Sequence, residues 1–148
     1  MGMSEREQII RMLPTATCLM TGAFESARAG AIVPWAMQCS REPLCICVAL
    51  YKGNRLSPMV RDSRVFGLCL IDGKSKLLVK RFGDLPAGPA KPDADPFIAC
   101  EMTKLVSEAP ILMKCVGALD CQVIRHLDFD GDHEMYIGQV VASRLPEV

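Results

Sequence analysis

A Gly131-Asp132-His133 turn carries the side chain whose type and position best suit chemistry on a ligand. The histidine follows a glycine turn and begins an apolar, strand-like segment, so its ring can point into a cleft at the end of a sheet. A solvated histidine on a surface hairpin is consistent with the same pattern, and both interpretations stay open. His133 is therefore the candidate catalytic residue of this chain.

Cationic and hydrogen-bonding side chains gather around a predicted helix start. The group consists of Lys52, Asn54, Arg55 and Ser57. Ser57-Pro58 is a typical N-cap and first-turn pair, which predicts a short helix ending at residue 61 or 63. Free backbone N–H groups at a helix N-terminus favour an anion, and two nearby cations add to that preference. The group predicts an anion-binding loop, although most loops with two cations are plain solvated turns.

Both groups are positioned by one stretch, residues 30–63, around which the rest of the chain is organised. Apolar runs at 31–35 and 44–50 predict two strands, and the polar residues 38–41 predict a turn between them. A strand pair flanked by a polar turn and a basic helix start can hold a flat aromatic ligand that carries a phosphate. Trp35, the only tryptophan, either walls such a ligand or lies in the core, which is the commoner fate.

Composition limits the function classes. With 148 residues, half of them apolar and 5% aromatic, the chain is expected to form one domain over residues 1–148 with a mainly aliphatic core. The 17 Lys and Arg balance 17 Asp and Glu, which argues against binding nucleic acid or an anionic membrane by bulk charge. No apolar run is long enough to span a membrane, and the polar first ten residues lack a signal peptide's apolar segment. We expect a cytoplasmic protein with no nucleic-acid or membrane partner.

Eight cysteines are present, and none forms a CxxC pair. Cys45 and Cys47 share one face of a predicted strand, because side chains alternate with period two. Zinc and iron–sulfur sites usually show CxxC spacing, so no metal site is expected. The cysteines are interpreted as buried thiols that act as small hydrophobes in a reducing compartment.

The sequence lacks the motifs of several enzyme classes. It contains no GxSxG, HExxH, Walker loop or GxGxxG. A nucleotide cofactor would therefore need an architecture other than the dinucleotide fold. The second histidine, His126, ends a predicted strand beside Arg125 and is expected to be solvated.

The remaining segments predict many short strands and few helices. Ser4 and Glu7 form a capping-box pattern that predicts a helix over residues 4–12, and Asp130-Gly131 predicts a hairpin turn. Further predictions are strands over 15–21, 65–71, 118–126 and 135–143, a polar turn over 22–29, a helix over 75–82 with Leu77, Leu78 and Phe82 inward, an irregular segment over 83–96, and a helical turn over 97–103. Short strands with three small helices favour a β-barrel with helical caps over a doubly wound α/β fold, because no long helices alternate with the strands.

In their order and spacing, these segments resemble the flavin reductase-like family, the FMN-binding split barrel. The matching motifs are residues 14–21, the Gly-led strand 30–36, Ser40-Arg41-Glu42-Pro43-Leu44, the polar loop and helix 52–63, Val65-Phe66, Gly131-Asp132-His133 and Gly138-Gln139-Val140. The resemblance covers residues 13–141. It implies a mainly β fold with small helices, a Greek-key split β-barrel, that dimerises with flavin at the subunit interface.

The same resemblance implies a flavin-binding oxidoreductase in which NAD(P)H reduces FMN, with FAD as the alternative, and electrons pass to free flavin, oxygen, or an acceptor protein such as a monooxygenase. In this interpretation the protein supplies placement and electrostatics. Val33, Pro34, Trp35 and Ala36 would run along the isoalloxazine, Gln38, Cys39 and Ser40 would line the ribityl and phosphate end, and Lys52, Asn54, Arg55 and Ser57 would complete the phosphate cradle. His133 would lie near the flavin, where a reduced nicotinamide can dock.

Three departures from the family pattern keep alternatives open. Leu44 replaces the usual second proline, Pro34-Trp35 replaces the common hydroxyl residues and removes one N–H donor, and the chain stops at Val148 where many relatives continue. The last two favour an FMN-binding electron-transfer protein without NAD(P)H reductase activity, whereas His133 favours the enzyme. A third hypothesis is a split barrel that has lost flavin and serves as an interaction domain or binds another flat ligand.

Overall fold

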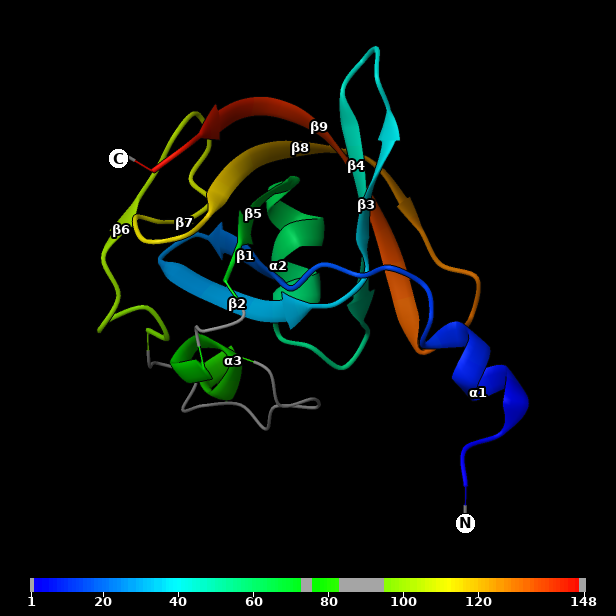
Figure 1. Ribbon diagram of the computed structural model, residues 1–148. Coiled ribbons are helices and arrows are strands. Elements are labelled where there is room, and N and C mark those ends of the chain that lie inside the picture. Colours follow the sequence, from blue (N-terminus) through cyan, green and yellow to red (C-terminus); the bar gives the residue numbers. More distant parts are fainter. Residues whose placement is uncertain (1, 73–75, 83–94, 147–148) are drawn as a thin grey trace.

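The computed structural model describes residues 2–72, 76–82 and 95–146 (Figure 1). Its elements are α1 (Glu5–Ile10), β1 (Cys18–Phe24), β2 (Ala27–Val33), β3 (Ala36–Ser40), β4 (Cys45–Tyr51), α2 (Leu56–Ser63), β5 (Val65–Leu70), α3 (Lys76–Phe82), β6 (Met102–Thr103), β7 (Ile111–Leu112), β8 (Gly117–Leu127) and β9 (His133–Arg144). Among the described residues strands dominate and the helices are short, as the sequence predicted.

Seven strands form one antiparallel sheet in the order β2-β1-β5-β8-β9-β4-β3. Its two edge strands, β2 and β3, are consecutive in the chain and only Pro34 and Trp35 separate them. The sheet must therefore curl until its edges meet at this joint, as Figure 1 shows. The Ala49 N–H donates to the Trp35 carbonyl at 2.9 Å and ties the joint to β4. This curled sheet with small helices confirms the predicted split-barrel fold.

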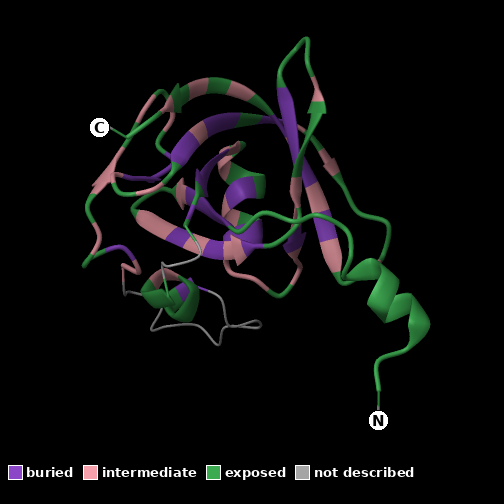
Figure 2. Cartoon of the chain, viewed as in Figure 1, coloured by how far each residue is buried: buried purple, intermediate pink, exposed green. Residues whose placement is uncertain are grey.

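Helix α2 lies against the curled sheet and connects β4 to β5 (Figure 1). Leu56 and Val60 are fully buried and join the larger core cluster with residues of β1, β2, β4, β5, β8 and β9. Gly22 on β1 permits this packing, since a Cβ there would come within 2.8 Å of the Leu56 Cδ1. The start of α2 is therefore held firmly relative to the strands. Figure 2 shows the buried residues concentrated on the strands and on this helix.

Helix α1 stands away from the barrel, and none of its residues is buried (Figures 1 and 2). The predicted capping box is present: the Ser4 Oγ accepts from the Glu7 N–H at 3.3 Å, and the Glu7 carboxylate accepts from the Ser4 N–H at 2.8 Å. Its apolar side chains are exposed, Ile9 at 56% and Ile10 at 60%. The described part of the chain leaves this apolar surface uncovered.

Two boundary predictions in the central stretch are wrong. The segment predicted as a polar turn contains β3, because polar side chains are tolerated on an edge strand, and the turn falls at residues 41–44. Helix α2 begins at Leu56 rather than being capped by Ser57, because the Asn54 Oδ1 accepts the Leu56 N–H at 2.8 Å. This frees the Ser57 side chain from capping and lets it be buried.

Other predictions differ in detail. The turn predicted over 22–29 shortens to Glu25 and Ser26, with Glu25 at a φ of 56° in a tight hairpin. Leu77 is 84% exposed rather than inward, and residues 97–103 form a turn followed by β6. Strands β5, β8 and β9 and their hairpin agree with the predictions. Most of the segment predicted to be irregular, residues 83–94, and the start of the α3 prediction lie outside the described residues.

Candidate functional site

An aromatic cluster forms where β4 ends and β9 begins, beside the β2–β3 joint. Tyr51 and His133 are direct register partners on β4 and β9. The His133 ring lies 4.7 Å from the Trp35 ring, centroid to centroid, and 5.7 Å from the Tyr51 ring, which it meets edge-on. The structure therefore brings His133 and Trp35, two of the residues selected from the sequence, into contact. Trp35 is 48% exposed, so its ring walls the surface instead of filling the core.

The His133 ring is oriented by the residue before it. Its Nδ1 lies 2.8 Å from the Asp132 Oδ1, and the side chain is 16% exposed. This hydrogen bond holds the pKa of the Asp132 carboxyl below its usual value. Because a carboxylate accepts hydrogen bonds, this contact is one that Nδ1–H donates. The Nε2 is then the ring nitrogen that is left to contact a ligand.

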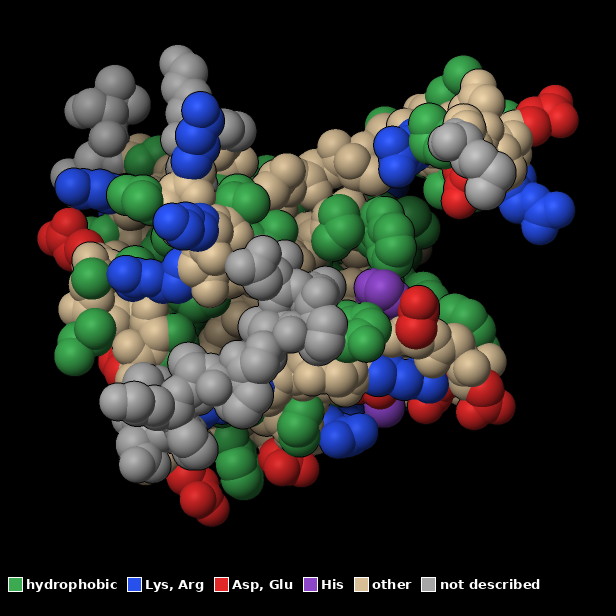
Figure 3. Space-filling model, turned by 90° about the horizontal axis from the view of Figure 1, so that it is seen from below, with side chains coloured by type: hydrophobic (Ala, Val, Ile, Leu, Met, Phe, Trp, Pro, Cys, Tyr) green, Lys and Arg blue, Asp and Glu red, His purple; other side chains and the backbone are tan. Residues whose placement is uncertain are grey.

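An apolar hollow of about 310 Å³ adjoins this cluster. It is lined by Ile10, Leu13, Pro14, Thr15, Pro34, Trp35, Ala36, Met37, Cys47, Ala49 and Met135. A more open hollow of about 660 Å³ continues from it beneath α1 and shares Trp35 and Pro34. Figure 3 shows hydrophobic side chains between the projecting N-terminal segment that carries α1 and the barrel, with a histidine at their edge. A flat apolar ligand fits this surface better than a polar one.

The predicted anion-binding loop, called the basic loop from here on, begins at Lys52, directly after Tyr51. The Lys52 N–H donates to the Asp132 carbonyl at 3.0 Å, and its Nζ pairs with the Asp128 Oδ1 at 2.5 Å. That hydrogen bond from Lys52 holds the pKa of Asp128 below its usual value. The Asn54 N–H donates to the Tyr51 carbonyl at 3.0 Å, so the loop turns tightly. Loop and aromatic cluster form one continuous site.

Arg55 and Ser57 occupy different environments at the start of α2. Arg55 is the N-cap residue and is half-buried. Ser57 is 2% exposed, and its hydroxyl donates to the Glu134 carboxylate and lies 2.9 Å from the Tyr136 hydroxyl. The Ser57 hydroxyl is thus engaged inside the protein, and its predicted contact with a ligand phosphate stays a prediction.

The remaining predicted residues on β3 lie elsewhere. Gln38 and Cys39 are exposed, Ser40 is half-exposed, and the Gln38 Nε2 donates to the Ser40 carbonyl at 3.2 Å. Ser40 pairs with Cys45, and at about 3.4 Å per residue Cys45 and Tyr51 stand about 20 Å apart along β4. These β3 residues and the basic loop therefore lie far apart within one chain, and the expectation that both line the phosphate end of a flavin stays a prediction. The reason for the separation is the β3 strand itself, which carries residues 38–40 away from the loop.

Sequence reasoning missed several residues of the site. Tyr51 became visible only through the register of β4 with β9, and Ala49 and Met135 line the hollow from the same two strands. The expectation that His126 is solvated is wrong: its ring stacks on Tyr136 at 4.7 Å, and its Nε2 is buried. The cross-strand pairing of His126 with Tyr136, which places both rings together, is not marked in the sequence.

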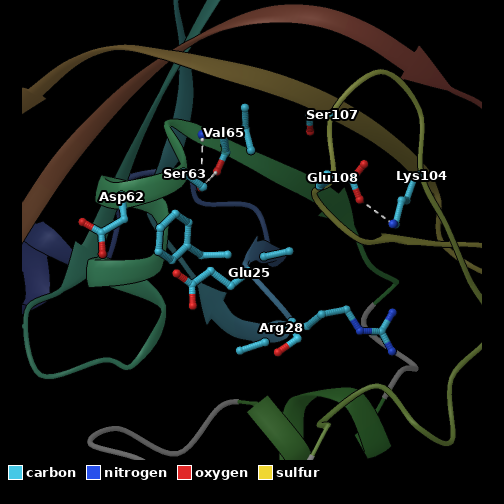
Figure 4. A pocket seen from close by; sticks show the side chains of 12 residues that line it. Glu25, Arg28, Asp62, Ser63, Val65, Lys104, Ser107 and Glu108 are labelled. Atoms are coloured by element: carbon cyan, nitrogen blue, oxygen red, sulfur yellow. Dashed lines mark hydrogen bonds and ion pairs between the residues drawn. The ribbon is translucent and has the colours of Figure 1, made fainter.

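A separate hollow of about 660 Å³ lies between the β1–β2 turn, the end of α2 and the 104–108 loop (Figure 4). Its two cations are already paired, Arg28 with Asp95 and Lys104 with Glu108. It shares no lining residue with the aromatic site. Of the residues selected from the sequence, Pro34, Trp35 and Ala36 line the hollow beside Trp35, and none lines this one.

The thiols and carboxylates of the described residues show no metal-binding group of three or more. All eight cysteines are free, five of them buried. In the part of the chain that the structure describes, no helix is long and apolar enough to cross a membrane.

Comparison with known proteins gives one family. The model of the flavin reductase like domain matches residues 10–148. A provisionally named diflavin flavoprotein, A 2, of Synechocystis sp. is 26% identical over 145 residues, which are 97% of this chain and 24% of that protein. The chain thus spans about a quarter of the length of that relative. The NADPH-flavin oxidoreductase of Streptomyces viridifaciens is 23% identical over 142 residues, 95% of this chain and 71% of that protein.

Solved structures share the fold. A provisionally assigned flavin reductase of Haemophilus somnus 129PT superposes with a TM-score of 0.83 at 18% identity, covering 100% of this chain and 91% of the other. The nitrilotriacetate monooxygenase component B homologue of Mycobacterium thermoresistibile gives a TM-score of 0.81 at 20% identity, covering 95% of this chain and 74% of the other.

Proposed function

This chain belongs to the flavin reductase-like domain family, and from that membership we propose that it binds FMN, with FAD as a possible alternative, and catalyses NAD(P)H-dependent flavin reduction. The observation that carries the proposal is the half-exposed Trp35 ring, fixed against His133 at the border of an apolar hollow. The basic loop begins directly after Tyr51, the register partner of His133. A flat aromatic ring system with a phosphate tail matches these surfaces in order.

The residues present fit a flavin mononucleotide. Val33, Pro34, Trp35 and Ala36 would run along the isoalloxazine, and the backbone N–H groups after Pro34 would serve the ring where the proline has none. The phosphate would lie against Lys52, Asn54 and Arg55 at the start of α2, where the N–H groups of Leu56 and Ser57 are already bonded to Asn54. When bound, the flavin supplies the redox chemistry: it accepts a hydride and passes electrons on.

His133 would act where the nicotinamide docks. Asp132 holds its Nδ1, so the opposite Nε2 can face a ligand and hold a proton at that atom. The Trp35 and Tyr51 rings exclude water from two sides of the imidazole. This arrangement supports the catalytic role assigned to His133 from the sequence.

A homodimer with flavin at its interface completes the site. The exposed apolar side chains of α1, of the segment that follows it and of β3 include Ile10 at 60%, Leu13 at 60% and Met37 at 65%, and they line the same hollows as Trp35. Large contiguous apolar surface of this kind marks an interaction site. Because residues 38–40 lie about 20 Å along the hairpin from the basic loop, they would contact the flavin held by another copy's loop. In a dimer, residues 38–40 of one chain and the basic loop of the other would thus contact the same flavin.

The electron source and acceptor are proposed from relatives. One relative is named an NADPH-flavin oxidoreductase, and one solved structure is a monooxygenase component B. We propose reduced nicotinamide as the donor and free flavin, oxygen or a monooxygenase partner as the acceptor. The chemistry is that of a cytoplasmic enzyme, with no nucleic acid or membrane among its partners.

One observation favours a second candidate, an FMN-binding electron-transfer protein without NAD(P)H reductase activity. Pro34 and Trp35 stand where the family commonly has hydroxyl residues, and the Trp35 ring lies 4.7 Å from the ring of His133, beside which a nicotinamide would dock. In this candidate a partner protein, and not a nicotinamide, would supply the electrons.

The visible absorption spectrum of the purified protein, loaded with FMN under anaerobic conditions, separates these candidates. Bleaching of the flavin bands on addition of NADH or NADPH supports the reductase. Bleaching by dithionite alone supports the electron-transfer protein. A protein that takes up no flavin overturns both.

A further inference from the structure

Glu134 is a buried carboxylate whose described ion-pair partner is a histidine, His126, and not a lysine or arginine. The residue is 4% exposed and lies on the face of β9 opposite His133, because neighbouring side chains alternate along a strand. A buried charge is costly unless hydrogen bonds compensate it. Asp120, the other buried carboxylate among the described residues, receives three hydrogen bonds from residues 106 and 107 and so anchors a loop. Glu134 needs an explanation of its own.

Hydroxyl groups hold one oxygen of this carboxylate. The Glu134 Oε1 accepts from the Ser57 hydroxyl, and the Tyr136 hydroxyl lies 2.8 Å from it. The Tyr136 hydroxyl also lies 3.1 Å from the Ser57 carbonyl. Both the side chain and the backbone of Ser57 are therefore joined to β9, although the two elements are more than 70 residues apart in sequence.

A histidine faces the other oxygen. The His126 Nε2 lies 3.4 Å from the Glu134 Oε2, and it is the one buried side-chain polar atom without a hydrogen-bond partner in the described ranges. The His126 ring is held parallel to the Tyr136 ring, at an angle of 14°. The stack thus holds the nitrogen beside the carboxylate.

This polar group ends at the anion-binding loop. Ser57 stands in the first turn of α2, and its N–H donates to the Asn54 carbonyl at 3.2 Å. The Asn54 Oδ1 in turn accepts the Leu56 N–H, and the Asn54 N–H donates to the Tyr51 carbonyl. Residues 51–57 are consequently fixed at one end by β4 and at the other by Glu134. A displacement of Ser57 would carry Asn54 and Arg55 with it.

We propose that Glu134 is a positioning residue, which with His126, Tyr136 and Ser57 fixes the first turn of α2 so that the loop recognises the phosphate of the flavin. This inference rests on the proposed function. Glu134 touches no ligand itself. Its effect is confined to the phosphate end, because His133 and Trp35 contact each other on the opposite face of β9.

Riboflavin provides the test, since it carries the same ring system as FMN without the phosphate. Affinities for both are measured by fluorescence quenching in the unaltered chain, Glu134→Gln and Tyr136→Phe. Glu134→Gln keeps the size and one acceptor oxygen but removes the charge that strengthens the hydroxyl bonds. Glu108→Gln, an exposed carboxylate paired with Lys104, is the matched control.

Glu134→Gln is expected to weaken FMN binding about tenfold while riboflavin affinity changes less than about twofold. Tyr136→Phe should act in the same direction, and it carries the test if Glu134→Gln does not fold. Equal losses for both ligands would show a general structural role and overturn the proposal, as would unchanged FMN affinity.

Amide hydrogen exchange over residues 54–60 gives a readout that needs no flavin. Faster exchange confined to this turn in Glu134→Gln supports the positioning role, and unchanged exchange overturns it. If the unaltered chain binds neither flavin, the proposed function fails, and exchange alone then decides whether Glu134 positions the turn.

Discussion

His133 and Glu134 are adjacent on β9 and face opposite sides of the strand. The His133 ring contacts Trp35 at the candidate site, while the Glu134 carboxylate is buried against Ser57 at the start of α2. His133 thus lies at the proposed nicotinamide-docking side of the flavin, while Glu134 acts on the phosphate side through the start of α2. The predictions below separate these contributions.

Arg55 should determine affinity for the phosphate. Replacing Arg55→Gln removes the cation at the N-cap of α2 and is expected to weaken FMN binding about tenfold, since a charge-assisted contact is worth about 1.5–3 kcal/mol. Isothermal titration with FMN and riboflavin checks this. Arg55→Lys, which keeps the charge, should retain part of the affinity. Equal FMN affinity in Arg55→Gln and the unaltered chain would remove Arg55 from the cradle.

The exposed apolar face of α1 should hold a second copy of the chain. Ile10→Glu places a charge on this face, where Ile10 is 60% exposed, and is expected to convert dimers to monomers at micromolar concentration without unfolding the barrel. Analytical ultracentrifugation measures the change. Ile98→Glu, at a residue that is 84% exposed and outside both hollows beside Trp35, is the control. A monomeric unaltered chain would contradict the interface.

Local patterns predicted the elements whose residues carry their own signals. Apolar runs marked β5, β8 and β9, and the capping box at Ser4 marked α1. The strand β3 was missed because an edge strand with exposed polar side chains has the composition of a turn. Residue 57 was assigned to the surface because its N-cap pattern is local, whereas its burial depends on Glu134, which only the folded sheet brings near. Long-range pairing, not composition, decides such positions.

Cys115 should be the most reactive thiol at neutral pH. A hydrogen bond from the Cys69 thiol lowers the pKa of Cys115 to about 7, whereas burial raises the pKa of Cys39 above its usual value. The thiolate is the nucleophile, so alkylation of Cys115 should rise through pH 7 and precede that of Cys39 at pH 8, although Cys39 is the more exposed. Peptide mapping after brief iodoacetamide treatment identifies the labelled residue. Earlier labelling of Cys39 would contradict the assignment.

The Arg28–Asp95 pair should stabilise the fold above acidic pH. The hydrogen bonds from Arg28 lower the pKa of Asp95, so this stabilisation is fully present above the unfolded carboxyl pKa of about 3.9 and is lost as the pH falls through the folded value. Asp95→Asn should cost about 0.5–1 kcal/mol at pH 7, because the pair is partly exposed. Urea unfolding of Asp95→Asn and the unaltered chain, at pH 7 and below pH 3, measures this cost. A cost that persists below pH 3 would contradict the electrostatic origin.

The central claim, that a flavin lies against Trp35, is tested most directly by the fluorescence of that residue. It is the only tryptophan, and its ring is 48% exposed at the hollow, so its emission reports on this site alone. Titration with FMN is predicted to quench the emission in a saturating curve with one flavin per chain, as expected for a ring stacked on the indole. Emission that stays unchanged while FMN binds would place the flavin elsewhere and contradict the account.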